Sequence, residues 1–136
     1  MNFYYEERRV TLMQPTLNPQ VLHELQAIRL DDGNNLACQL VTIFLDVTPA
    51  LIDELHAACA SGDATTAARL ISRLRGSSSC IGALHFADLC AELERLEPTN
   101  RSTVSQRIGR VRDEYARLEY ALAEYVEPRF AYAYGS

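Results

Sequence analysis

The stretch from residue 104 to residue 125 constrains the fold most, because its large apolar side chains recur at intervals of four and three residues. These positions are Val104, Ile108, Val111, Tyr115, Leu118, Leu122 and Tyr125. Such spacing places all of them on one side of an α-helix and does not fit the alternation of a β-strand. A helix of about 25 residues with one apolar stripe needs other helices to cover that stripe, as in a helical bundle.

A second apolar stripe predicts another long helix over residues 36–58. Its positions are Leu36, Leu40, Phe44, Val47, Leu51, Leu55 and Ala58. Thr48-Pro49 interrupts this stripe. Because proline lacks a backbone donor and crowds the preceding turn, we expect a kink or a restart of the helix there. Gly62 is a suitable C-terminal residue for this helix, and Asp63 is a suitable N-cap for the next one.

Three further helices are predicted from the same periodicity. Asn18-Pro19 is typical of a helix start, and a turn follows at residues 31–34. A helix over residues 63–82 ends at Gly82 and carries inward Ala67, Leu70, Leu74, Ser77 or Ser78, and Ile81. The next helix ends at Pro98-Thr99-Asn100 and carries inward Phe86, Leu89, Cys90, Leu93 and Leu96.

Helices joined by short connections pack antiparallel, so the sequence predicts an all-α protein built as an up-down bundle. The chain has 136 residues, which suits one compact domain. We divide it into an N-terminal extension over residues 1–18, a helical bundle over 19–127 and an aromatic tail over 128–136. Nine of the eleven aromatic residues lie within residues 1–5 or from 115 onward, so the two ends are expected either to pack together or to form an adhesive surface.

The charge of the chain argues against several classes of partner. The formal net charge is −5, and all 13 basic residues are arginine. A negative chain is poorly suited to the phosphate backbone, so we expect no nucleic-acid partner. No uninterrupted apolar run reaches about 18 residues, so we expect no membrane partner. Residues 1–10 lack the apolar core of a secretory signal, so we expect the cytoplasm.

The four cysteines, Cys38, Cys59, Cys80 and Cys90, each lie in a predicted helix. A metal site or a redox pair is one interpretation, but their spacings match no zinc signature and include no Cys-x-x-Cys pair. We therefore interpret them as small buried apolar residues. The sequence also contains no Glu-x-x-His pair of the kind that holds metals inside helical bundles. We expect no metal and no cofactor.

One side of the predicted helix over residues 63–82 carries no large apolar residue. Within about 60° of Ser72 on a helical wheel lie Ala68, Arg69, Arg75, Gly76 and Ser79. Arg69 and Arg75 flank Ser72 by three residues, so they either hold an anion over it or form ordinary surface ion pairs. Gly76 is unexpected, because glycine inside a helix costs about 1 kcal/mol relative to alanine. It indicates either the close approach of a partner or a tolerant surface position.

The segment from Arg69 to Ala83 resembles the signature helix of histidine-containing phosphotransfer (HPt) domains. In that family a histidine is followed by any residue, Leu or Phe, Lys or Arg, Gly, Ser, and Ser or Ala, with a Gly-Ala further on. Arg75, Gly76, Ser77 and Gly82-Ala83 match this pattern. Residues 86–94 are similar to the family's Leu-Cys-x-x-Leu-Glu stretch, and the resemblance covers residues 19–126. It implies a four-helix bundle with an additional N-terminal helix.

The sequence departs from this family at the phosphoacceptor, where Ser72 replaces the histidine. An imidazole is nucleophilic near neutral pH, whereas a serine hydroxyl without an adjacent base is a weak nucleophile. The other histidines, His23, His56 and His85, lack the Arg-Gly surroundings and are not expected to substitute. The resemblance therefore implies a pseudo-HPt protein, not an enzyme, that binds receiver domains or a hybrid sensor histidine kinase without relaying phosphate. The expected contact residues, which we call the Ser72 face, are Ala68, Arg69, Ser72, Arg73, Arg75, Gly76 and Ser79.

Three alternatives stay open on the sequence alone. In the first, Ser72 is an engineered replacement in an ordinary HPt protein. In the second, the chain is a helical oligomerisation or scaffold module that uses its aromatic ends and ignores the Ser72 face. In the third, it is an active phosphotransfer intermediate despite the serine.

Overall fold

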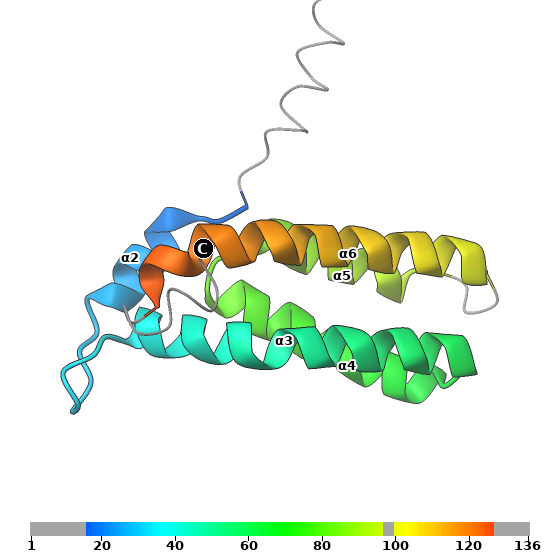
Figure 1. Ribbon diagram of the computed structural model, residues 1–136, viewed down its shortest axis with the longest axis horizontal. Helices are drawn as coiled ribbons and strands as arrows, with labels where there is room; N and C mark the ends of the chain where they lie inside the picture. Colours follow the sequence, from blue (N-terminus) through cyan, green and yellow to red (C-terminus); the bar gives the residue numbers. More distant parts are fainter. Residues whose placement is uncertain (1–15, 97–99, 127–136) are drawn as a thin grey trace, which may run out of the picture.

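The computed structural model describes residues 16–96 and 100–126 and shows a bundle of helices (Figure 1). The elements are α2 (Pro19–Gln26), α3 (Leu36–Ser61), α4 (Ala64–Cys80), α5 (Leu84–Glu94), α6 (Arg101–Leu122) and the 3₁₀ turn η1 (Ala123–Tyr125). The described residues contain no β-strand, only an isolated bridge between Arg29 and Asn35. The predicted all-α class is confirmed.

The helices α3 to α6 form a closed ring of neighbours. α3 packs against α4 and α6, and α5 packs against the same two helices. Figure 1 shows α3 beside α4, and α5 beside α6, while α2 lies at one end of the bundle. α2 packs against α3. The arrangement is the four-helix bundle with an additional N-terminal helix that the family resemblance implies.

Polar side chains determine where four of the helices begin. In each case a side-chain oxygen accepts a hydrogen bond from a backbone N–H that has no partner inside the helix. The pairs are Asn18 with Gln20, Asn35 with Cys38, Asp63 with Thr66, and Asn100 with Thr103. α3 ends at Gly62, whose φ of 77° is the left-handed conformation that glycine adopts freely. The caps predicted at Asn18, Gly62 and Asp63 are confirmed, whereas Asn100 begins α6 and does not end the preceding helix.

α3 is one continuous helix of 26 residues that contains Pro49. The restart that we expected at this proline is wrong. Pro49 has no N–H to offer to the carbonyl oxygen of Leu45, four residues earlier. The hydroxyl of Tyr115 in α6 donates a hydrogen bond to that oxygen at 3.0 Å. A donor from another helix therefore replaces the missing one, and α3 continues through the proline.

Among the described residues, α3 is also long and apolar enough to cross a membrane, with a mean hydropathy of 1.6 over 18 residues. Our expectation considered only uninterrupted apolar runs and missed this property. Ten residues of α3 are buried inside the bundle, among them Val41, Leu45 and Ile52. Burial of one side against other helices explains the apolar composition of α3 as that of a core helix.

Aromatic rings and one glycine hold the middle and one end of the bundle together. The ring centroid of Phe44 lies 5.8 Å from that of Phe86, edge to face, and 6.2 Å from that of Tyr115. Gly82 has a φ of 78°, and its carbonyl oxygen accepts a hydrogen bond from the N–H of Asn18 at 2.8 Å. A Cβ atom at Gly82 would lie 2.9 Å from the carbonyl oxygen of Asn18. This glycine therefore lets the start of α2 lie against the α4–α5 connection.

Several expectations about burial need correction. Cys38 and Cys90 are buried as expected, but Cys59 is only partly buried and Cys80 is exposed. Cys80 is exposed because it lies nearer to the Ser72 side of α4 than to the buried side. Conversely, Glu114 is only 2% exposed, and its Oε1 lies 3.3 Å from Nη1 of Arg117. The predicted end of the helix that follows Gly82, at Pro98-Thr99-Asn100, is wrong, because α5 already ends at Glu94. The predicted roles of residues 1–5 and 128–136 lie outside the described residues.

Candidate functional site

All seven residues of the Ser72 face are exposed on α4. The other side of this helix carries the buried residues Leu70, Ile71, Leu74 and Ser78. Because an amphipathic helix turns its apolar side toward the core, these residues fix the rotation of α4 and direct Ser72 to solvent. The structure therefore brings the seven predicted residues together on the open side of one helix.

Gly76 leaves the backbone of α4 uncovered. A Cβ atom built on Gly76 would meet no atom within 4 Å, so no contact in the described residues requires glycine at this position. Gly76 lies one turn after Ser72, and the uncovered backbone is therefore next to the Ser72 side chain. The site thus combines a hydroxyl with a patch of helix that a partner can approach closely.

The serines after Gly76 divide between core and surface. Ser78 is fully buried, and its hydroxyl donates to the carbonyl oxygen of Leu74 at 2.7 Å. The hydroxyl of Ser77 donates to the same oxygen at 3.2 Å. These bonds satisfy two small polar groups where α4 packs against its neighbours. The prediction that Ser77 and Ser78 lie nearer the core than Ser79 is confirmed.

Nothing in the described residues activates the Ser72 hydroxyl. It has no hydrogen-bond partner among residues 16–96 and 100–126. His23 lies on α2, His56 on α3 and His85 on α5, and none of them bonds to Ser72. Among the described residues, no three His, Cys, Asp or Glu side chains lie together in a group that could hold a metal ion. A serine hydroxyl in such surroundings is a weak nucleophile.

Arg75 has a partner that the sequence did not reveal. Its guanidinium forms an ion pair with the carboxylate of Glu94 at the end of α5. The two side chains are 46% and 40% exposed, so solvent reaches the pair. Sequence spacing placed Arg75 beside Ser72, but Glu94 belongs to another helix and its approach depends on the packing of α4 against α5.

Charge also gathers at the start of α4. Hydrogen bonds from the side chain and the backbone N–H of Thr66 lower the pKa of Asp63, and the nearby positive charge of Arg69 lowers it further. Asp63 therefore stays negative at neutral pH. Its carboxylate also complements the partial positive charge at the N-terminus of α4.

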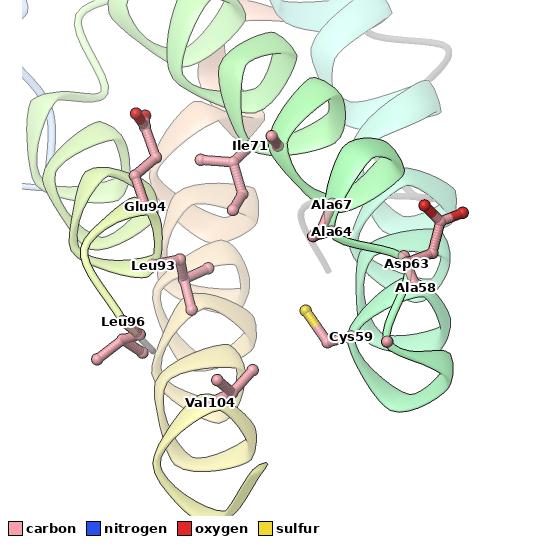
Figure 2. Close-up of a pocket in the computed structure, with 12 residues that line it drawn as sticks. Ala58, Cys59, Asp63, Ala64, Ala67, Ile71, Leu93, Glu94, Leu96 and Val104 are labelled. Carbon is pink, nitrogen blue, oxygen red and sulfur yellow. The ribbon is translucent and has the colours of Figure 1, made fainter. Parts of the chain in front are cut away.

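Figure 2 shows an apolar pocket between the helices. It has a volume of about 290 Å³ and lies between the end of α3, the first half of α4, the end of α5 and the start of α6. Ala68, a member of the Ser72 face, and Glu94, the partner of Arg75, both line it. Small side chains such as Ala64 and Ala67 leave this space open. Because four helices contribute, no local sequence pattern could have predicted the pocket.

Comparison with known proteins supports the architecture. A family model described as the Hpt domain matches residues 39–123. The match begins in the first turn of α3 and ends at the start of η1, so it contains the whole of α4 and every residue of the Ser72 face. No curated protein and no solved structure matches the chain.

Proposed function

This chain belongs to the Hpt domain family, and on that premise we propose that it is a binding module of a two-component phosphorelay that does not carry the phosphoryl group itself. Hpt domains are phosphotransfer modules, not classical enzymes, and they interact with receiver domains and kinases. One observation carries the proposal. Where the family resemblance expects a histidine, this chain has the exposed Ser72, whose hydroxyl has no base bonded to it in the described residues.

The chemistry of a relay requires more than an exposed oxygen. A histidine nitrogen accepts a phosphoryl group near neutral pH, and the resulting phosphoramidate returns it readily to an aspartate. A serine needs a general base to attack, and its phosphate ester is a poor donor to a carboxylate. Ser72 therefore supports docking but not a reversible relay.

The partner that we propose is a receiver domain, either separate or within a hybrid sensor histidine kinase. Receiver domains gather carboxylates around their active site. The Ser72 face carries Arg69, Arg73 and Arg75 and no acidic residue. Complementary charge speeds association and orients the partners. The small residues between the arginines leave room for close approach of the partner backbone.

A binding screen against the receiver domains of the source organism tests this function, with Ser72→His measured in parallel. We expect the wild type to bind at least one receiver without taking up radiolabelled phosphate from it. Ser72→His should accept the label as an acid-labile product. The proposal is wrong if the wild type binds no receiver, or if it accepts phosphate and passes it on. The same binding is expected whether Ser72 is natural, as in a pseudo-HPt protein, or an engineered replacement in an active HPt protein.

A second candidate is a helical scaffold that assembles through its aromatic ends, with exposed apolar residues of the bundle as additional contacts. Tyr120 on α6 is 79% exposed and Ile43 on α3 is 49% exposed, and apolar groups in water favour association. Light scattering of the full chain and of a chain without residues 1–15 and 128–136 separates the two functions. A scaffold requires an assembly larger than a monomer, whereas receiver docking does not.

A further inference from the structure

We infer that Glu94 sets the affinity of the Ser72 face, because it occupies Arg75 as an internal substitute for a carboxylate of the partner. The inference rests on the proposed function and concerns the regulation of the same surface. It assigns a role to a residue outside that surface, at the end of a different helix.

The first step is competition for one cation. Arg75 follows Ser72 by three residues on α4, and in the free protein its guanidinium bonds to Glu94. A guanidinium carries five N–H donors in a planar fork, and Glu94 already holds the Nη1 donor of Arg75. An incoming carboxylate that uses Arg75 must therefore share or replace the contact with Glu94.

The second step is the ease of exchange. Both side chains are close to half exposed, and exposed ion pairs contribute little to stability. Glu94 lines the apolar pocket, and Figure 2 shows its carboxylate pointing away from Leu96. Glu94 can rotate into solvent without disturbing the core. The need to displace Glu94 from Arg75 therefore weakens the binding of a partner without preventing it.

Arg75 is the only arginine of the Ser72 face that is restrained in this way within the described residues. Neither Arg69 nor Arg73 forms an ion pair there; the other three pairs join Arg107 to Glu92, Arg112 to Asp53 and Arg117 to Glu114. Asp63 interacts with Arg69 only through their charges, without an ion pair, so among the described residues Glu94 is the carboxylate in direct contact with a cation of the Ser72 face. Partners that present a well-placed carboxylate to Arg75 displace Glu94, and weakly acidic partners do not.

The test compares Glu94→Gln with a matched control, Glu92→Gln. Glu92 lies two residues earlier on α5, is similarly exposed, and pairs with Arg107 at 2.8 Å. Both substitutions change the net charge by the same amount, but only Glu94→Gln releases Arg75. The probe is the receiver domain that the wild type binds in the screen, titrated by calorimetry. We expect Glu94→Gln to bind it about two- to fivefold more tightly than Glu92→Gln does, the range that one exposed ion pair supplies.

Two further measurements exclude a general effect of charge or of structure. In an Arg75→Gln background, the advantage of Glu94→Gln over Glu92→Gln should disappear, because the competition has been removed. Binding of Glu94→Gln should also weaken more steeply with salt than binding of the wild type, since the wild type exchanges one ion pair for another. Equal affinities for the two glutamine variants, or an advantage that persists without Arg75, would overturn this inference. Absence of any receiver binding by the wild type would instead overturn the proposed function.

Discussion

The hydroxyl of Tyr115 in α6 donates a hydrogen bond to the carbonyl oxygen of Leu45 in α3, 70 residues earlier in the chain, at 3.0 Å. That oxygen lacks its helical donor because Pro49 lies four residues after it. The bond is buried, and the Tyr115 ring also packs against Phe44. One side chain of α6 thus allows a proline inside the longest helix of the bundle and ties the two helices together.

Tyr115→Phe should destabilise the protein by about 1–2 kcal/mol, because it leaves the buried Leu45 carbonyl without a donor while keeping the ring. Urea unfolding followed by circular dichroism measures the change. In a Pro49→Ala background the backbone N–H returns and satisfies Leu45 from within α3. The loss on Tyr115→Phe should then be much smaller, and an equal loss in both backgrounds would contradict this account.

Gly76→Ala should stabilise the protein by about 0.5–1 kcal/mol and at the same time weaken receiver binding. The added methyl group meets no atom of the domain, so only the higher helix propensity acts on folding. Gly109→Ala is the control, since Gly109 lies in α6 and also has no atom within 4 Å of a Cβ atom. Both variants should gain stability, and only Gly76→Ala should lose affinity, with a greater loss for Gly76→Leu. Unchanged binding of Gly76→Leu would show that no partner approaches this helix closely.

Arg75→Glu should weaken receiver binding by about tenfold or more without unfolding the bundle, because it removes a cation and places a second carboxylate near Glu94. Arg107→Glu is the matched control. Arg107 on α6 is 34% exposed, against 46% for Arg75, and pairs with Glu92 on α5, the helix that also carries Glu94. Arg107 lies outside the Ser72 face. If the two variants lose affinity equally, long-range charge and not a local contact determines binding.

Local periodicity was enough to predict the rotation of α4 and the exposure of the Ser72 face. The positions of Leu70 and Leu74 determine which side of that helix is buried, and this depends on residues three and four apart. The same reasoning predicted the caps at Asn18 and Asp63. Features set by neighbouring residues within one helix could therefore be predicted from the sequence.

Features that depend on the packing of two or more helices could not be predicted from the sequence. The partner of Arg75 lies 19 residues away on α5, and the donor that lets α3 continue through Pro49 lies on α6. The apolar pocket requires the ends of four helices. The burial of Glu114 on α6, where the other buried residues are apolar or aromatic, likewise depends on the neighbouring helices. These properties follow from how the helices pack, which spacing along one helix does not specify.

Asp63 makes the stability of α4 depend on pH in the acidic range. The hydrogen bonds from Thr66 hold the pKa of Asp63 below its ordinary value in the folded protein. A group whose pKa is lowered by folding stabilises the folded protein at pH values above its unfolded pKa, which is about 3.9 for aspartate. This stabilisation is lost as the pH falls through the pKa of the folded state. Asp63→Ala should therefore destabilise the protein at pH 7 and progressively less below about pH 4.

Asn100→Ala is the control for that pH dependence. Asn100 caps α6 through an uncharged side chain that accepts a hydrogen bond from the N–H of Thr103 at 3.3 Å. The loss caused by Asn100→Ala should stay constant over the same pH range. Urea unfolding of the wild type and both variants between pH 3 and pH 7 measures the difference. A loss for Asp63→Ala that is also constant with pH would show that its charge plays no part in the cap.

The cysteines should react with thiol reagents in an order set by their burial, and this order provides a footprint of docking. Cys80 is exposed next to Ser79, whereas Cys90 is buried, and burial raises the pKa of its thiol to about 12. Because the thiolate is the reactive form, Cys80 should react first and Cys90 only on unfolding. Cys59, whose pKa is also raised by burial, should react at an intermediate rate.

A receiver bound to the Ser72 face should slow alkylation of Cys80 and leave the rate at Cys59 less affected. Mass spectrometry of protein alkylated for increasing times, with and without the receiver, measures both rates. Cys80→Ser should bind as the wild type does, because the protection depends on coverage and not on a contact with the sulfur. If Cys80 reacts equally fast in the complex, the receiver binds elsewhere on the bundle, and the Ser72 face is not the docking surface.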